Sequence, residues 1–291
     1  MNRLLLISLC LACAGCGSSE VDELVMRLKT RDAAELREIR SKLVRLPNAI
    51  AVPALRKGLH ADKWRTRYMS AQLLGRFQAQ EAIPELLAAL HDSIGGVRVQ
   101  AAGALGRLQA QGAVPTLIDL LDEDAEVVQI AALEALGAIG SSQALPALCR
   151  LTQSEPLGVR GAAISVLGPC HDFEGAPVLS AKALQYTRQA LDDVFIRIRI
   201  AGIVSLRGFS YQGAVADLLR LAQDASPEVQ HVAVQSLGEI TSSRHAAWQD
   251  HPGPDMSLIT SALDSIRTAT DNAAVRERAL QSLAKIAAGT G

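Results

Sequence analysis

Apolar positions recur along most of the chain with a period of 31 residues. Five prolines mark this period: Pro53, Pro84, Pro115, Pro146 and Pro177. One slot holds leucine in all eight blocks: Leu43, Leu74, Leu105, Leu136, Leu167, Leu206, Leu237 and Leu283. The slot four residues earlier is small in seven of the eight blocks, and the slot three residues later is apolar in all of them. Spacings of three and four residues place these side chains on one face of a helix.

A second helix is predicted to follow the first in each block. Its first turn contains the proline, which fits there because the N–H group of that position has no partner inside the helix. The blocks begin near residues 30, 61, 92, 123, 154, 193, 224 and 270. Each block is therefore predicted to form a helical hairpin, and such hairpins bury their apolar faces by stacking on one another.

The pattern resembles a known repeat family. The residues that carry the resemblance are Asp92, then Val97-Arg98-Val99-Gln100-Ala101-Ala102-Gly103-Ala104-Leu105-Gly106, and then Ala113-Val114-Pro115-Thr116-Leu117. They resemble the HEAT-like repeats named after phycobilisome lyases, over roughly residues 30–288. The resemblance implies an all-α fold, an α-solenoid of about eight hairpins, in a family that spans enzymes, scaffolds and adaptors. A capping helix is expected at about Val21–Lys29, and a single closing helix at Ala273–Ala287.

Two insertions interrupt the period. The first lies near residues 181–189 and is predicted to lengthen a second helix by about two turns. The second lies near residues 243–257 and contains Pro252-Gly253-Pro254, which indicates a loop. Solenoid insertions often lie on a binding face, so we identify His245, Trp248, Asp250 and His251 as candidate partner-binding residues. A metal site there and a passive loop are the alternatives, although the spacing of the histidines and aspartates matches no known metal site.

An acidic residue early in many blocks is followed five or six residues later by arginine. The arginines are Arg67, Arg98, Arg160, Arg199 and Arg276. One interpretation is a stripe of positive charge that binds an anionic ligand. We favour a structural ladder of acid–arginine pairs that joins one repeat to the next, because each arginine has an acid of its own.

The N-terminus resembles a bacterial lipoprotein signal peptide over residues 1–15. Arg3 precedes a short apolar run, which ends in Cys13-Ala14-Gly15-Cys16. The resemblance implies lipidation of Cys16, with Cys13 as the alternative. Plain secretion is a second interpretation, and a buried N-terminal helix, which fits poorly, is a third. Residues 16–29 would then form the lipidated N-terminus, a short spacer and the capping helix, and residues 30–291 the solenoid. Gly17 after the cysteine resembles the signal that enteric-type bacteria use for the outer membrane, which implies a protein anchored there and facing the periplasm.

Composition narrows the function classes. A net charge of −1 argues against a nucleic-acid binder, which needs excess positive charge. Only 3% of the residues are aromatic, which favours a core of close-packed helices. Cys149 and Cys170 stand in apolar slots, where they are either core residues or, in an oxidising compartment, a disulfide.

The sequence contains no His-Glu dipeptide, Gly-rich phosphate loop or Gly-x-Ser-x-Gly motif. We therefore expect that the protein is not an enzyme and has no catalytic residue, cofactor or metal. We predict a membrane-anchored scaffold or adaptor that binds a protein of the cell envelope on a curved helical surface. The alternatives are a HEAT-like enzyme of the lyase or hydroxylase type and a self-associating architectural protein. The oligomeric state stays open.

Overall fold

The computed structural model describes residues 17–122, 125–172, 174–209, 214–242 and 256–289. Within these ranges the chain forms helices and their connections, which confirms the predicted all-α class. The chain divides into two compact units, Met1–Ile139 and Gly140–Gly291. The sequence predicts one continuous array. The periodicity carries no signal of the division, because Leu136 and Leu167 keep the 31-residue spacing across it.

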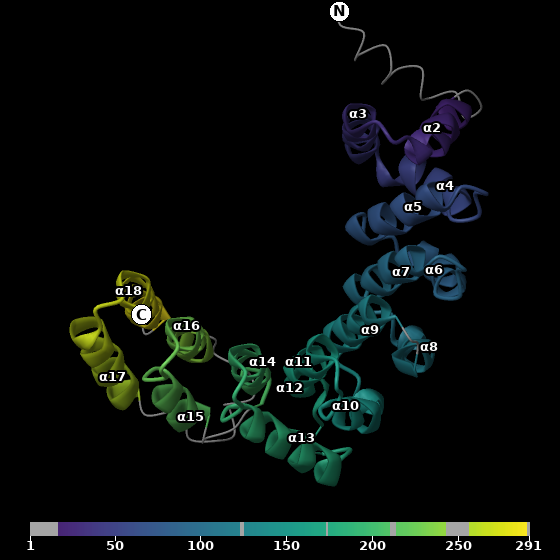
Figure 1. Cartoon of the computed structure of the whole chain (residues 1–291). Coiled ribbons are helices and arrows are strands. Elements are labelled where there is room, and N and C mark those ends of the chain that lie inside the picture. Colours follow the sequence, from purple (N-terminus) through teal and green to yellow (C-terminus); the bar gives the residue numbers. More distant parts are fainter. Residues whose placement is uncertain (1–16, 123–124, 173, 210–213, 243–255, 290–291) are drawn as a thin grey trace, which may run out of the picture. The chain divides into compact units, whose positions relative to one another are not determined.

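Unit 1 consists of two layers of helices (Figure 1). One layer contains the first helices of the blocks: α3 (Ala33–Arg45), α5 (Trp64–Arg76), α7 (Gly95–Arg107) and α9 (Glu126–Ile139). The other layer contains α2 (Gly17–Met26), α4 (Asn48–Gly58), α6 (Ile83–Ala89) and α8 (Val114–Asp119). Short 3-10 turns lie next to these helices, at Arg27–Lys29, Gln80–Ala82, Gln111–Ala113 and Leu120–Asp122.

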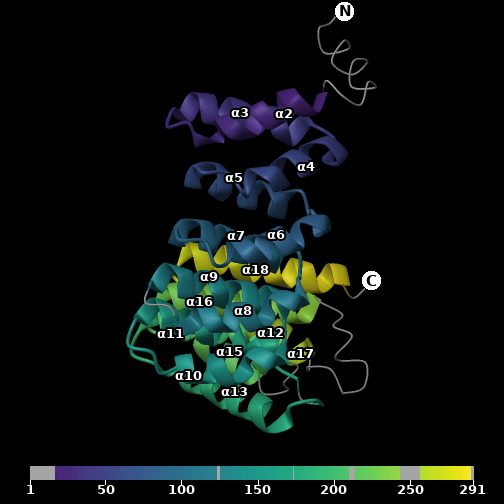
Figure 2. The same ribbon diagram turned by 90° about the vertical axis from the view of Figure 1, so that its right-hand side faces the viewer.

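The pairs of first and second helices in unit 1 cross the predicted block boundaries. α4 packs on α5, α6 on α7 and α8 on α9, so each second helix lies against the first helix of the following block. Figure 2 shows the first two of these pairs as successive rows. The small slots explain the pairing of α4 with α5, because a Cβ atom added to Gly58 would collide with the Ser70 side chain. The first helices also stack on one another, α5 on α7 and α7 on α9.

The repeated leucine slot forms the core of both units. Leu43, Leu74, Leu105 and Leu136 in unit 1 are completely buried, as are Leu167, Leu206 and Leu237 in unit 2. The eighth leucine, Leu283, lies in the last helix and is only partly buried. The helix face predicted from the 3–4 spacing is therefore the face that each unit buries.

The prolines begin the second helices at four of the five positions. Pro84, Pro115, Pro146 and Pro177 lie in the first two positions of α6, α8, α10 and α13. Pro53 differs, because α4 begins at Asn48 and includes the proline in its middle. The expectation that the proline lies in the first turn of the second helix is therefore wrong for Pro53. Pro53 has no N–H group to bond within the helix, and its ring lies on the exposed side.

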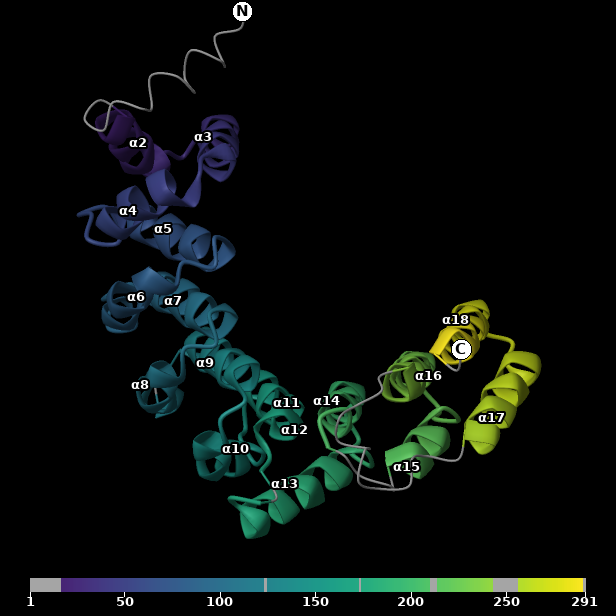
Figure 3. The same cartoon turned by 180° about the vertical axis from the view of Figure 1, so that it is seen from behind.

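Unit 2 has the same two-layer arrangement (Figure 3). Its second helices are α10 (Leu145–Leu151), which follows a 3-10 turn at Ser142–Ala144, α13 (Pro177–Ala190), α15 (Ala214–Leu221) and α17 (Met256–Ala269). Its first helices are α11 (Leu157–Ser165) with α12 (Leu167–Cys170), α14 (Ile196–Leu206), α16 (Pro227–Ser242) and α18 (Ala273–Gly289).

Two irregular elements occur in the block that begins near residue 154. The first helix is divided into α11 and α12 at Val166, three residues before Pro169, whose missing N–H cannot bond to the preceding turn. The second helix, α13, is 14 residues long, whereas α10 has 7. The residues of the first insertion, near 181–189, therefore extend α13.

The N-terminal helix starts earlier than the sequence predicts. α2 begins at Gly17, directly after Cys16, and a 3-10 turn at Arg27–Lys29 completes it. The expected spacer between Cys16 and Val21 is therefore helical. At the other end, α18 packs on α16 and α17 and occupies the predicted closing position.

Candidate functional site

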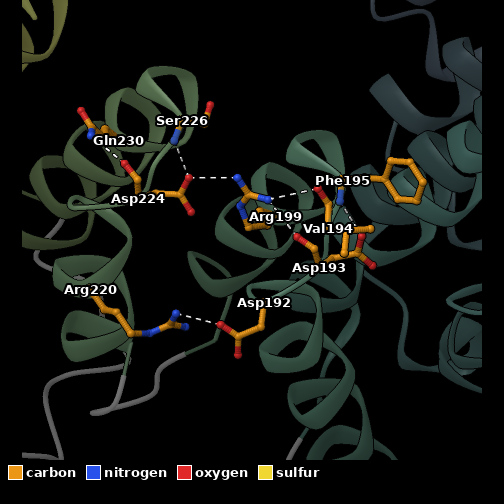
Figure 4. A network of polar contacts seen from close by, with 9 residues as sticks. All are labelled: Asp192, Asp193, Val194, Phe195, Arg199, Arg220, Asp224, Ser226 and Gln230. Atoms are coloured by element: carbon orange, nitrogen blue, oxygen red, sulfur yellow. Dashed lines mark hydrogen bonds and ion pairs between the residues drawn. The ribbon is translucent and has the colours of Figure 1, made fainter.

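Arg199 on α14 connects two loops of unit 2 (Figure 4). Its Nη2 atom donates a hydrogen bond to Asp224 Oδ1 at 2.9 Å, in the loop before α16. Its Nη1 atom donates to the carbonyl oxygen of Asp193 at 2.9 Å, in the loop before α14. The side chains of Arg199 and Asp224 are largely buried. One guanidinium group therefore fixes the start of its own helix and the start of the next first helix.

Arg67 makes the same arrangement in unit 1. Its Nε and Nη2 atoms donate to the two carboxylate oxygens of Asp92 at 2.5 and 2.9 Å. Its Nη1 atom donates to the carbonyl oxygens of Ala61 and Asp62 at 2.8 and 3.0 Å. The hydrogen bond from Arg67 lowers the pKa of Asp92 below its usual value, although partial burial acts in the opposite direction.

The carboxylate partner comes from the following block in both pairs. Asp62 and Asp193 stand in the same block as their arginine, and they contribute backbone carbonyl oxygens. The other members of this slot also donate to a preceding carbonyl: Arg98 to Asp92, Gln129 to Leu121, Gln230 to Asp224 and Arg276 to Thr270. Arg160 in the same slot instead contacts an aromatic ring. Its guanidinium carbon lies over the ring of Phe195, 5.6 Å from the ring centre.

A groove of about 720 Å³ lies between α13 and α15 in unit 2. Its wall on the α13 side consists of Ala181, Leu184, Gln185, Arg188 and Gln189, all within the first insertion. Asp192, just after α13, and Asp217 and Arg220 of α15 complete the lining. The inserted turns of α13 therefore create one side of the groove.

Two ion pairs cross this groove in opposite directions. Arg188 Nε on α13 lies 3.3 Å from Asp217 Oδ2 on α15. Arg220 Nη1 on α15 donates to Asp192 Oδ1 at 2.8 Å, as Figure 4 shows. Both arginines and Asp192 are at least half exposed, whereas Asp217 is buried. Exposed ion pairs contribute about 0–1 kcal/mol, so a bound partner can displace Arg220 from Asp192 readily.

The sequence alone does not predict this groove. The insertion that extends α13 is visible as eight residues beyond the period. Asp217 and Arg220 are also visible as charged residues of the block that begins near residue 193. Nothing in one sequence indicates that Arg188 lies opposite Asp217, because that contact joins residues 29 positions apart across two helices.

The lipidation and loop residues lie outside the described parts of the chain. Cys13 and Cys16 belong to residues 1–16, and His245, Trp248, Asp250 and His251 belong to residues 243–255. Lipidation and partner binding by the loop therefore stay predictions. None of the described helices is long and apolar enough to cross a membrane. The described residues also include no group of three or more histidines, cysteines, aspartates or glutamates placed to hold a metal ion.

Cys149 and Cys170 are not joined by a disulfide in the structure, and both are buried in unit 2. Burial raises the pKa of Cys149, and it raises the pKa of Cys170 to about 12. A thiol with so high a pKa is a poor nucleophile at neutral pH. The two residues therefore act as small core residues in this structure.

Two repeat families match the chain. Residues 86–168 match the family described as HEAT repeats, and residues 66–92 match the family described as PBS lyase HEAT-like repeat. Residues 66–168 therefore carry HEAT-like repeats. The matched residues include most of α5 and all of α7 and α9 in unit 1, together with α10 and α11 in unit 2. None of the curated proteins matches the sequence.

Solved structures with the same fold are known. The complex of CpcE and CpcF of phycocyanin lyase, from a Nostoc species, is similar with a TM-score of 0.55 and 20% identity, over 83% of this chain and 95% of that one. The YibA protein of Escherichia coli is similar with a TM-score of 0.53 and 16% identity, over 98% of this chain and 97% of that one. At these identities the likeness shows the α-solenoid fold that the HEAT-like repeats predict.

The expectation that the chain is not an enzyme is wrong. One matched family takes its name from PBS lyase, and one similar structure is a phycocyanin lyase, so this class of repeat occurs in an enzyme. The expectation depended on the absence of short catalytic motifs. Motifs of that kind are tied to particular reactions, so their absence does not exclude an activity that arises from a binding surface.

Proposed function

We propose that this protein is a lipid-anchored scaffold or adaptor of the cell envelope that binds a protein partner on its HEAT-like repeats. The observation that carries the proposal is the groove between α13 and α15. Its wall on the α13 side is formed by the first of the two insertions that interrupt the repeat period. In repeat proteins, departures from the period commonly serve binding, because the regular repeats already supply the fold.

The lining of the groove suits a polypeptide. Arg188 and Arg220 are balanced by Asp192 and Asp217, so the site has no net formal charge. The lining offers hydrogen-bond donors and acceptors together with the apolar Leu184. A backbone segment with mixed polar and apolar side chains matches this chemistry better than a polyanion, which requires excess positive charge. The volume is also in the range of ligand-binding sites.

The N-terminus supports the membrane part of the proposal. The sequence Cys13-Ala14-Gly15-Cys16 follows an apolar run, and α2 starts at the next residue, Gly17. A lipid chain on Cys16 would therefore be attached directly to a helix that packs on α4. A tether of this kind adds at most about 3.5 Å per residue, so unit 1 would lie against the membrane. We place the protein at the outer membrane, facing the periplasm.

A crosslinking pull-down from the membrane fraction of the native host tests the proposal. Three forms of the tagged protein are compared: the intact chain, a deletion of residues 243–255, and Ala181→Trp, which fills the groove. We expect the intact chain to capture a specific envelope protein and Ala181→Trp to lose it. Loss with the deletion alone would move the contact to the loop. Failure of every form to capture a specific protein would overturn the scaffold proposal.

The PBS lyase HEAT-like match favours a second candidate function. In that case the protein acts as an enzyme on a bound protein or on a group attached to it. An absorption spectrum and elemental analysis of the purified protein would reveal a bound pigment or metal. The intact mass of the captured partner, from cells with and without this protein, would reveal a covalent change. Light scattering of the purified chain separates both candidates from a self-associating architectural protein, which would form defined oligomers and capture no other protein.

A further inference from the structure

Asp217 is a buried acid at the base of the groove. Its side chain is 12% exposed, whereas the side chain of Asp192 at the other ion pair is 70% exposed. The Oδ2 atom of Asp217 accepts no hydrogen bond from any residue that the structure describes. Arg188 Nε lies 3.3 Å from this atom. The two groups form an ion pair, but their geometry does not meet that of a hydrogen bond. A buried acceptor without a donor is costly, so a ligand that supplies the donor is favoured.

Unit 1 contains an acid at the equivalent repeat position. Glu85 and Asp217 are both the 25th residue of their blocks, counted from Ala61 and Asp193. Glu85 Oε1 accepts a hydrogen bond from Arg56 Nε at 2.8 Å and a second from Arg56 Nη2. Arg56 and Arg188 also occupy equivalent positions, once the eight inserted residues are subtracted. The Arg56–Glu85 pair therefore has two hydrogen bonds that the Arg188–Asp217 pair lacks, although Glu85 Oε2, like Asp217 Oδ2, accepts none from the described residues.

The chemistry of the groove defines what Asp217 can bind. A buried charge acts through a lower dielectric than an exposed one, so Asp217 dominates the potential at the base of the groove. Arg188 is half exposed, so a ligand cation that carries hydrogen-bond donors can take its place beside the carboxylate. Leu184 on the wall can contact the aliphatic stem of such a side chain.

We propose that the groove between α13 and α15 binds a lysine or arginine side chain of the partner polypeptide, with Asp217 Oδ2 as the acceptor. The inference rests on the proposed function, because it assumes that the ligand is a polypeptide. The ammonium or guanidinium group replaces the loose contact of Arg188 with a charge-assisted hydrogen bond. Gln185 and Gln189 on the wall offer donors and acceptors to the backbone of the same segment.

Peptide display tests this inference on the full chain purified in detergent. A phage library of random 12-residue peptides is selected against the wild-type protein, and the best peptide is synthesised. We expect one basic position shared by the selected peptides. We also expect Asp217→Asn to weaken the affinity at least tenfold, as should replacement of the basic residue of the peptide by norleucine. Glu85→Gln serves as the matched control and should change the affinity less than twofold.

The outcomes separate the inference from the proposed function. Asn is close in shape to Asp, and a thermal melt checks that Asp217→Asn is folded. Ala181→Trp provides a second variant that blocks the groove without changing its charge, and it should also abolish peptide binding. Selected peptides without a shared basic residue, or equal affinity for Asp217→Asn, would overturn the inference and leave the scaffold proposal standing. Selection of no peptide, combined with no partner in the pull-down, would overturn both.

Discussion

Arg67 and Arg199 show why one slot of the repeat favours arginine. A planar guanidinium group with five donors can bond to a carboxylate and to backbone carbonyls at the same time. Arg67 uses Asp92 and the Ala61 carbonyl in this way, and Arg199 uses Asp224 and the Asp193 carbonyl. Gln129 and Gln230 in the same slot bond to a carbonyl through their amide nitrogen. The recurrence of the slot is visible in the sequence, but the identity of the carboxylate partner depends on how the blocks stack.

Replacing Asp92 with asparagine should make unit 1 less stable at neutral pH. The change removes the charge that pairs with Arg67 and keeps a side-chain oxygen for the Ile94 N–H group. Hydrogen bonds to charged groups contribute about 1.5–3 kcal/mol, which is the expected loss in the free energy of unfolding at pH 7. Urea denaturation, followed by Trp64 fluorescence in a Trp248→Phe background, measures this loss.

The same pair predicts a pH dependence. Because the pKa of Asp92 is lowered in the folded protein, its contribution is complete above the usual aspartate value of about 4. The contribution is lost as the pH falls through the lowered pKa. The wild-type protein should therefore lose stability below about pH 4 more steeply than Asp92→Asn. Asp62→Asn is the control, since Asp62 contacts Arg67 through its backbone oxygen. Parallel pH curves for wild type and Asp92→Asn would contradict the prediction.

The two buried thiols should be inert until the protein unfolds. Burial raises the pKa of Cys170 to about 12 and also raises the pKa of Cys149, so few thiolates exist at pH 8. Iodoacetamide without reductant should therefore label both residues only after addition of denaturant, as detected by peptide mass mapping. A disulfide-linked pair of peptides containing Cys149 and Cys170 would show that they are joined instead.

At the scale of helices, the first helices of unit 1 approach closely through small residues. A Cβ atom on Gly106 of α7 would lie 2.9 Å from Ala135 Cα and 3.2 Å from Ala135 Cβ on α9. Contacts this short involve backbone, which cannot move without shifting a whole helix. The small side chains and the buried leucines are therefore parts of one packing arrangement.

Replacing Gly106 with alanine should destabilise unit 1 by about 1–3 kcal/mol, the usual range for overpacking. The matched control is Gly112→Ala, in the turn before α8, where no atom lies within 4 Å of the new methyl group. The free energy of unfolding of Gly112→Ala should lie within about 0.5 kcal/mol of the wild-type value. Urea denaturation of both variants measures the difference. An equal stability of the two variants would show that α7 and α9 do not pack as described.

The sequence predicts most helices and misses those whose boundaries depend on local backbone chemistry. The leucine slot, the small slot and four of the five prolines give the helix order, because each repeats in register. α4 starts before Pro53, and α11 ends before Pro169 disturbs the helix. Neither event changes the spacing of apolar residues. The groove was likewise not predictable, because its ion pairs join neighbouring second helices through side chains that are polar in any arrangement.

For the whole molecule, the sequence identifies the type of repeat but does not reveal the division after Ile139. The periodic slots run through the boundary without a break. The absence of catalytic motifs also gave a wrong expectation about enzymatic function, since HEAT-like repeats occur in a phycocyanin lyase. Function in this class depends on surfaces formed by several blocks, which a single sequence defines poorly.

Lipidation of Cys16 predicts how the protein behaves in cells. Cys16→Ser should prevent incorporation of labelled palmitate and move the protein from the membrane fraction to the soluble fraction. Cys13→Ser should leave both properties unchanged. Two or more acyl chains are needed for stable anchoring, so nearly all of the lipidated wild-type protein should be found in the membrane fraction. Palmitate incorporation that persists in Cys16→Ser and is lost in Cys13→Ser would assign the anchor to Cys13.

Site-specific photocrosslinking in living cells tests the central claim most directly. A photoreactive p-benzoylphenylalanine replaces Gln185, an exposed residue on the groove wall, or Glu81, an exposed residue in a turn of unit 1. If the groove between α13 and α15 holds a protein partner, irradiation should give a defined crosslinked species with the probe at residue 185 and none with the probe at residue 81. No crosslink at residue 185, or the same species from both positions, would contradict the assignment of partner binding to this groove.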